Sequence, residues 1–131
     1  MRSKLILSIG RLSNEKNFIH LLMAWNKIFK KYPDWKLHIV GEGNKKDEMM
    51  AYIESNEMEE CCMILPFTNN VHKHYSEAQI FVLSSLFEGL PMVLLEAQQY
   101  GIPCVSYDCE TGPRDIIVDG ENGFLVKNQQ K

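Results

Sequence analysis

Short apolar runs alternate with segments of helical periodicity along the chain, and this alternation restricts the fold more than any other feature. The first run, Leu5 to Gly10, reads LILSIG and ends in glycine, which is typical of a buried strand. From Asn17, a predicted N-cap, apolar residues then recur every three or four positions until Pro33 stops the helix. The inward set is Phe18, Leu22, Trp25, Phe29 and Tyr32.

The same alternation continues to the end of the chain. Further strands are predicted in WKLHIVG, CCMILPF, QIFVLSS, IPCVSY and GFLV. Helices are predicted in NKKDEMMAYIE with Met49, Met50 and Ile53 inward, in VHKHYSEA, from Pro91 to a stop near Gly101, and from Arg114 to Val118. This order predicts an α/β fold: a doubly wound, Rossmann-like parallel sheet covered on both faces. In the common strand order 3-2-1-4-5, strands 1 and 4 are neighbours.

Length and composition limit the function classes. The 131 residues suit one domain, residues 1–131, and 45% hydrophobic with 24% charged residues is typical of a soluble globular protein. A formal charge of -3 argues against a general nucleic-acid binder. Arg11 interrupts the N-terminal apolar run, and no stretch approaches the roughly 20 apolar residues of a membrane span. We therefore predict a cytoplasmic protein.

The cysteines lack the spacing of a metal site. Cys61, Cys62, Cys104 and Cys109 form no CxxC pair, so we expect buried, reduced thiols and no zinc.

Positive charges are predicted to gather where the strand order reverses. The loop after the first strand, GRLSNEKN, carries Arg11 and Lys16, and the loop after the fourth, SLFEGLP, leads into the helix at Pro91. Ligands of a doubly wound sheet bind outside the carboxyl ends of the strands at this reversal. Two cations beside a helix start, with its unpaired N–H groups, suit a diphosphate.

The stretch FEGLPMVLLEA places Glu88 and Glu96 eight residues apart. In a continuous helix their carboxylates would lie roughly 12 Å apart along the axis, too far to act on one bond. We therefore expect Glu88 in the loop and Glu96 inside the helix, framing a bound phosphate, with Glu96 accepting hydrogen bonds from a ribose diol.

Several of these segments resemble a known family. GRLSNEKN, GEG, FEGLPMVLLEA, YGIPCVS, TGPRDII and DGENGFLV are similar to the C-terminal, donor-binding domain of retaining GT-B glycosyltransferases of family 4, over residues 4 to 126. CETGPRDII looks most like bacterial enzymes that use UDP-hexoses in lipopolysaccharide or capsule assembly. The resemblance implies retention of the donor's anomeric configuration, with no cofactor and no essential metal.

The resemblance also implies roles for individual residues. Arg11 and Lys16 would bind the diphosphate and Glu96 the ribose, while Glu88 and the backbone at Gly89 and Leu90 would face the transferred sugar and the distal phosphate. The implied donor-binding set is Gly10, Arg11, Lys16, Pro66, Phe67, Glu88, Gly89, Leu90, Pro91 and Glu96, with Pro66 and Phe67 beside the base. The implied catalytic set is Glu88, Arg11 and Lys16.

The chain departs from the family pattern in two places. It covers only the donor domain, so it is predicted to bind a UDP-sugar without transferring it. The acceptor, a saccharide or a lipid-linked saccharide, would need a further N-terminal domain, and the full-length enzyme would associate with the inner face of the membrane. LPFTNN replaces a glycine-rich family pattern, which leaves recognition of the base open.

Other hypotheses fit less well. GEG at Gly41 to Gly43 has Lys46 where a dinucleotide fingerprint needs a third glycine. Asp108 and Glu110 resemble a metal-binding pair but are predicted to be loop acids, and His72 and His74 are predicted to be surface residues. A receiver domain would need acids where the first strand ends. A non-catalytic nucleotide-sugar sensor and a GT-B epimerase or phosphorylase stay open.

Overall fold

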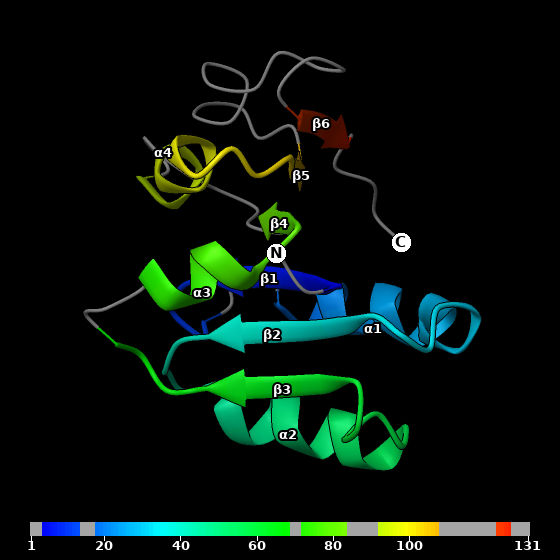
Figure 1. The fold of residues 1–131 in the computed structure, drawn as a ribbon. Helices are drawn as coiled ribbons and strands as arrows, with labels where there is room; N and C mark the ends of the chain where they lie inside the picture. Colours follow the sequence, from blue (N-terminus) through cyan, green and yellow to red (C-terminus); the bar gives the residue numbers. More distant parts are fainter. Residues whose placement is uncertain (1–3, 14–17, 69–71, 84–91, 108–122, 127–131) are drawn as a thin grey trace.

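The computed structural model describes residues 4–13, 18–68, 72–83, 92–107 and 123–126, which form a parallel sheet with helices on both faces (Figure 1). In chain order the elements are β1 (Leu5–Ile9), α1 (Phe18–Ile28), the 3-10 turn η2 (Phe29–Lys31), β2 (Lys36–Val40), α2 (Lys46–Ser55), β3 (Cys62–Leu65), α3 (His72–Glu77), β4 (Ile80–Leu83), α4 (Met92–Gln99), β5 (Cys104–Tyr107) and β6 (Gly123–Val126). The predicted alternation of strands and helices is confirmed in these ranges.

The sheet has the predicted doubly wound topology. Its strand order is β3-β2-β1-β4-β5-β6, and every neighbouring pair is parallel. The chain builds outward from β1 to β3, then crosses back to place β4 on the other side of β1. The predicted adjacency of the first and fourth strands is therefore confirmed, and the reversal lies between β1 and β4.

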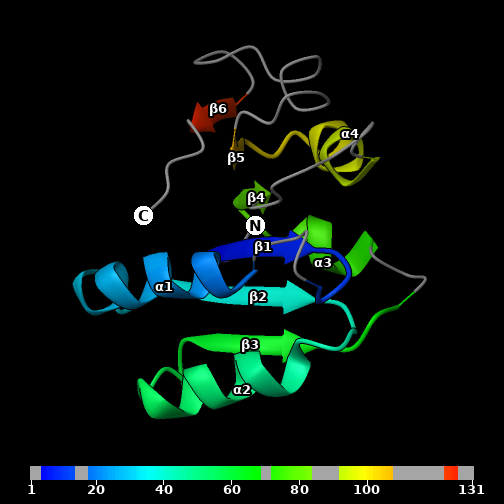
Figure 2. The same ribbon diagram turned by 180° about the vertical axis from the view of Figure 1, so that it is seen from behind.

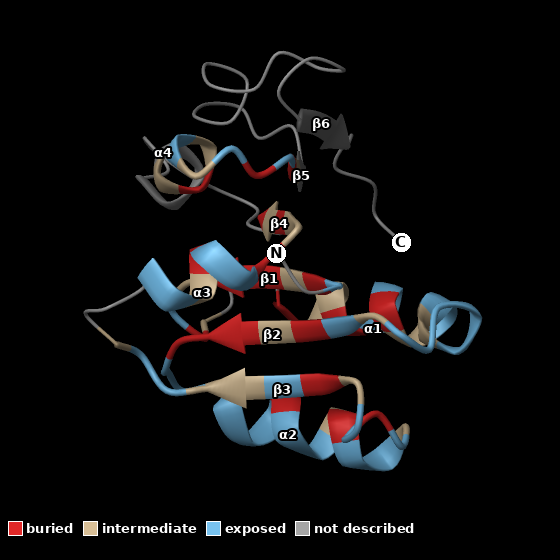
Figure 3. Cartoon of the chain, in the orientation of Figure 1, coloured by how far each residue is buried: buried red, intermediate tan, exposed pale blue. Residues whose placement is uncertain are grey.

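One face of the sheet is covered by α1 and α2 (Figure 2). Apolar side chains of these helices pack on β1, β2 and β3, and burial follows their inner faces (Figure 3). The buried members of this cluster are Leu12, Phe18, Leu22, Trp25, Leu37, Ile39, Met49, Ile53, Met58 and Cys62. We call it the α1/α2 cluster.

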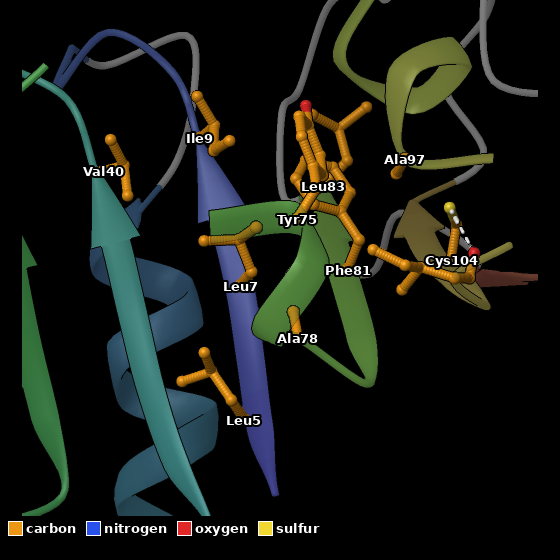
Figure 4. Packing of buried hydrophobic residues seen from close by; sticks show 11 residues of the cluster. Leu5, Leu7, Ile9, Val40, Tyr75, Ala78, Phe81, Leu83, Ala97 and Cys104 are labelled. Atoms are coloured by element: carbon orange, nitrogen blue, oxygen red, sulfur yellow. Dashed lines mark hydrogen bonds between the residues drawn. The ribbon is translucent and has the colours of Figure 1, made fainter. Parts of the chain in front are cut away.

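The other face is covered by α3 and α4. Because side chains alternate across a strand, Leu5, Leu7 and Ile9 of β1 point to this face, whereas Ile6 packs against the α1/α2 cluster. The buried members are Leu5, Leu7, Ile9, Val40, Tyr75, Ala78, Phe81, Leu83, Ala97, Ile102 and Cys104 (Figure 4). We call it the α3/α4 cluster.

The first helix is shorter than predicted. Phe18, Leu22 and Trp25 are buried as expected, but α1 ends at Ile28 and continues only as the η2 turn. Tyr32, predicted to face inward, is 52% exposed. The tighter 3-10 winding of η2 changes the angle between successive residues, so Tyr32 leaves the apolar face before Pro33 is reached.

The helix α2 buries Met49 and Ile53 as predicted, but the prediction for Met50 was wrong. Met50 is 40% exposed. Met49 and Ile53 are four residues apart and share a face, whereas Met50 is turned about 100° from Met49. The burial of Met58, which lies beyond the end of α2 and is fully buried, was not predicted from the sequence.

Both α2 and α4 end in the same hydrogen-bonded motif. At α4, the N–H of Gly101 donates to Gln98 O at 2.9 Å and the N–H of Ile102 donates to Ala97 O at 3.2 Å. Gly101 has φ of +73°, so the predicted glycine stop is confirmed. At α2, Glu57 takes the equivalent position with φ of 56°.

The described cysteines are free thiols. Cys62 and Cys104 are buried as predicted, and burial raises their pKa values to about 12 and about 11. Cys61 is only partly buried, because it lies just before β3 rather than within it. Cys109 lies outside the described residues, as does the helix predicted from Arg114 to Val118.

Candidate functional site

The carboxyl ends of β1 and β4 mark the edge where the ligand site is predicted. The two strands pair through Ile6 with Ile80 and Leu7 with Phe81. Beyond these pairs, the hydroxyl of buried Ser8 donates to Val82 O at 2.7 Å. A side-chain bond thus keeps the two strands together toward the reversal point.

The loop that carries Arg11 is fixed by the loop after β2. The N–H of Gly10 donates to Val40 O and the N–H of Leu12 donates to Glu42 O, both at 3.0 Å. Lys45 N–H donates in turn to Leu12 O at 2.9 Å. Leu12 is fully buried, whereas Arg11 is exposed. The backbone on both sides of Arg11 is therefore held in place while its side chain reaches solvent.

The two glycines of the GEG segment allow the loop after β2 to approach the loop after β1 closely. A Cβ atom on Gly41 would collide with the carbonyl oxygen of Gly10, and one on Gly43 would collide with the backbone of Leu12. These glycines therefore serve the packing of the two loops, a role unrelated to the dinucleotide fingerprint considered in the sequence.

Glu96 lies inside α4, more than one turn beyond Met92, where the helix begins. Its side chain is half-buried, and Oε1 accepts a hydrogen bond from the hydroxyl of Tyr75 at 3.1 Å. Burial raises the pKa of Tyr75, and the negative charge of Glu96 raises it further. Tyr75 therefore stays protonated and donates to the carboxylate.

Two aromatic rings lie close to the ring of Tyr75. Its ring stacks on Tyr100 with centroids 5.2 Å apart and planes 14° apart, and it lies 5.9 Å from Phe81. Figure 4 shows Tyr75 close to Phe81 of β4. The hydroxyl of Tyr100 is 2.7 Å from Nδ1 of His72. His72 is exposed as predicted, and it also contacts Tyr100.

Other predicted site residues are placed as follows. Gly10 lies at the end of β1, and Pro66 and Phe67 follow β3 with Phe67 60% exposed. The remaining predicted site residues lie outside the described residues: Lys16, Glu88, Gly89, Leu90 and Pro91. The structure thus places Arg11 and the helix bearing Glu96 after two neighbouring parallel strands.

No three His, Cys, Asp or Glu side chains in the described ranges gather closely enough to hold a metal ion. No helix in the same ranges is long and apolar enough to cross a membrane.

A family description, "Glycosyl transferases group 1", matches residues 1–131. The chain belongs to this glycosyltransferase family. It is 39% identical over 124 residues to the amylovoran biosynthesis glycosyltransferase AmsD of Erwinia amylovora. That match covers 95% of this chain and 34% of AmsD. The chain therefore spans about a third of the length of this glycosyltransferase.

Solved glycosyltransferase structures share the fold. The crystal structure of TarM superposes with a TM-score of 0.94 at 29% identity, over 99% of this chain and 26% of TarM. The pneumococcal O-GlcNAc transferase GtfA, crystallised with UDP and GlcNAc, gives a TM-score of 0.93 at 25% identity, over 98% of this chain and 26% of GtfA. These neighbours are GT-B glycosyltransferases, which confirms the Rossmann-like fold class.

In this glycosyltransferase domain, the contact of Tyr75 with Glu96 was not predicted from the sequence. The segment HKHYSE contains one signal, its tyrosine. A large aromatic residue in an otherwise polar short helix is expected to pack against the sheet. The partner of its hydroxyl was not predictable, since Glu96 lies 21 residues further along the chain.

Proposed function

We propose that this chain is the donor-binding domain of a retaining glycosyltransferase of family 4. The full-length enzyme would transfer the hexose of a UDP-hexose to a saccharide or lipid-linked acceptor and release UDP. One observation carries the proposal: β1 and β4 are parallel neighbours, so Arg11 and the helix bearing Glu96 both follow the carboxyl edge of the sheet. The complex of the related GtfA with UDP and GlcNAc supports UDP as the nucleotide.

Arg11 and Lys16 would bind the diphosphate. Arg11 is suited to this role because the loop after β2 fixes its backbone while its side chain is exposed. A guanidinium offers several N–H donors to phosphate oxygens. As the bond to the sugar breaks, negative charge develops on the leaving nucleoside diphosphate, and cations already in position lower that barrier. In this proposal the side-chain cations would stabilise that charge without a metal ion.

The remaining donor groups would contact the sugar and the nucleoside. Glu96 would accept hydrogen bonds from the ribose hydroxyls, and Glu88 with the backbone of Gly89 and Leu90 would face the transferred sugar. Pro66 and Phe67 would lie beside the base. The exposure of Phe67 at the carboxyl end of β3 supports its availability to a ligand.

The donor domain would work together with an acceptor-binding domain. Because the chain spans about a third of AmsD, we expect it to bind UDP without transferring a sugar. A lipid-linked acceptor would bring the full-length enzyme to the inner face of the membrane.

Calorimetry with UDP, GDP and ADP tests the proposal. We expect UDP to bind best, and Arg11→Ala to weaken UDP binding at least tenfold, about 1.4 kcal/mol. Glu96→Ala should also weaken UDP. Lys27→Ala is the matched control, because Lys27 is an exposed cation in the last turn of α1, at the opposite edge of the sheet. Its affinity for UDP should equal that of the wild type.

Two results would contradict the proposal. Equal UDP affinity of the wild type, Arg11→Ala and Glu96→Ala would exclude the proposed site. Isomerisation of a UDP-sugar by the chain in the absence of any acceptor would favour a GT-B epimerase instead.

A further inference from the structure

We infer that Tyr75 is a positioning residue that orients the carboxylate of Glu96 toward the ribose diol of a bound nucleoside diphosphate. This inference rests on the proposed function, because it assigns Glu96 to the ribose. It extends that function by explaining how a carboxylate on α4 is held ready before the ligand arrives.

The contact between the two residues is long-range and specific. Tyr75 is on α3 and Glu96 is on α4, and the Tyr75 hydroxyl donates to Oε1 of Glu96 at 3.1 Å. Tyr75 is fully buried, whereas Glu96 is only half-buried. The donor is thus fixed in the interior, and the acceptor lies between the interior and the surface.

The ring of Tyr75 is buried and packs against two further aromatic rings, and this packing favours one position of its hydroxyl. Tyr100 stacks on the ring with a 14° interplanar angle, and Phe81 of β4 lies against it at a 38° angle. A free glutamate side chain has several rotamers, and ordering it on ligand binding reduces affinity. A hydrogen bond from a fixed phenol selects one orientation in advance.

The carboxylate keeps capacity for a ligand while it is bonded to Tyr75. An ionised carboxylate has two oxygens with about four acceptor positions, and one hydroxyl donor uses one of them. A ribose diol offers two hydroxyl donors. The geometry therefore suits one internal donor that orients Glu96 and two external donors that Glu96 recognises.

The test compares UDP with 2′,3′-dideoxy-UDP, which keeps the diphosphate and the base but lacks the ribose diol. The affinity ratio of these two ligands reports the ribose contact alone. We expect at least a tenfold preference for UDP in the wild type, and a much smaller preference in Glu96→Gln. Tyr75→Phe keeps the stacked ring and removes only the hydroxyl. It should reduce the ratio at least threefold while affinity for dideoxy-UDP stays unchanged.

Tyr100→Phe is the matched control, because it removes a hydroxyl from the same stack without removing the donor to Glu96. Its ratio should equal that of the wild type. Thermal unfolding of each variant confirms that folded protein is compared, and a purely structural bond between α3 and α4 would lower stability without changing the ratio.

The outcomes separate this inference from the function on which it rests. If Glu96→Gln loses the preference for UDP but Tyr75→Phe keeps or increases it, the positioning role is overturned and the ribose role of Glu96 stands. If the wild type does not distinguish the two ligands, or binds neither, the ribose role itself fails and the inference fails with it.

Discussion

The two faces of the sheet are packed by different chemistry. Nearly all of the α1/α2 cluster is apolar: Leu22, Leu37, Ile39 and Met49 are fully buried. The α3/α4 cluster contains Tyr75, whose hydroxyl bonds a carboxylate on the neighbouring helix. The first face therefore contributes mainly to stability. The second contributes to stability and also orients a candidate ligand-binding group.

This division follows from the topology. The helices α1 and α2 pack on the half of the sheet formed by β1, β2 and β3, where they bury long apolar stripes. The helices α3 and α4 flank β4, next to the reversal point where ligands of such sheets bind.

The largest expected effect comes from a cavity on the α1/α2 face, which tests whether that face contributes mainly to stability. Leu22→Ala removes a fully buried side chain from α1. We expect it to lower the free energy of unfolding by about 3 kcal/mol, through lost burial and a cavity. Urea unfolding measures this loss. The preference for UDP over dideoxy-UDP in the remaining folded protein should be unchanged, and a reduced preference would show that the two faces are coupled.

A smaller effect on stability is expected from the C-terminal caps of α2 on one face and α4 on the other. Glu57 after α2 and Gly101 after α4 occupy the same left-handed position, and each is followed by a buried residue, Met58 or Ile102. Gly101→Ala should destabilise the protein by about 1 kcal/mol, because left-handed backbone is costly for residues with a Cβ. A Cβ at Gly101 would meet no atom within 4 Å, so the cost is one of backbone conformation alone.

The matched substitution at the cap of α2 should raise the stability of the protein rather than lower it. Glu57→Gly relieves the strain at an exposed position, although glycine also gains freedom in the unfolded chain. We therefore expect a stabilisation smaller than the loss in Gly101→Ala, measured by thermal unfolding of both variants. Destabilisation by Glu57→Gly would mean that the Glu57 side chain contributes more than its backbone costs.

These caps also show what the sequence could predict. Gly101 was predicted as a helix stop because glycine is the usual residue at a left-handed cap. Glu57 gave no such signal, so the burial of Met58, which depends on that cap, was missed. The strand order was predictable because alternating strands and helices leave few topologies. Tyr32 and Met50 were misplaced because periodicity does not reveal where a helix tightens or how wide its buried stripe is.

The candidate site was predictable only in part. Arg11 and Glu96 were identified from their loops and helix, and the structure places both after neighbouring strands. The packing role of Gly41 and the bond from Tyr75 were not predictable, because each depends on contact between segments far apart in the chain.

The smallest predicted effect is a pH dependence that belongs to the α3/α4 face. Burial lowers the pKa of His38 on β2 from its ordinary value of 6.5, and His74 and Lys36 lower it further, while Glu77 acts in the opposite direction. Below pH 6.5 the unfolded chain therefore binds more protons at this residue than the folded chain does. Neutral His38 therefore contributes to the free energy of unfolding above pH 6.5. This contribution is lost as the pH falls through the pKa of His38 in the folded protein. His38→Gln should reduce this acid-induced loss in urea unfolding, and equal losses in both proteins would show that His38 does not link protonation to folding.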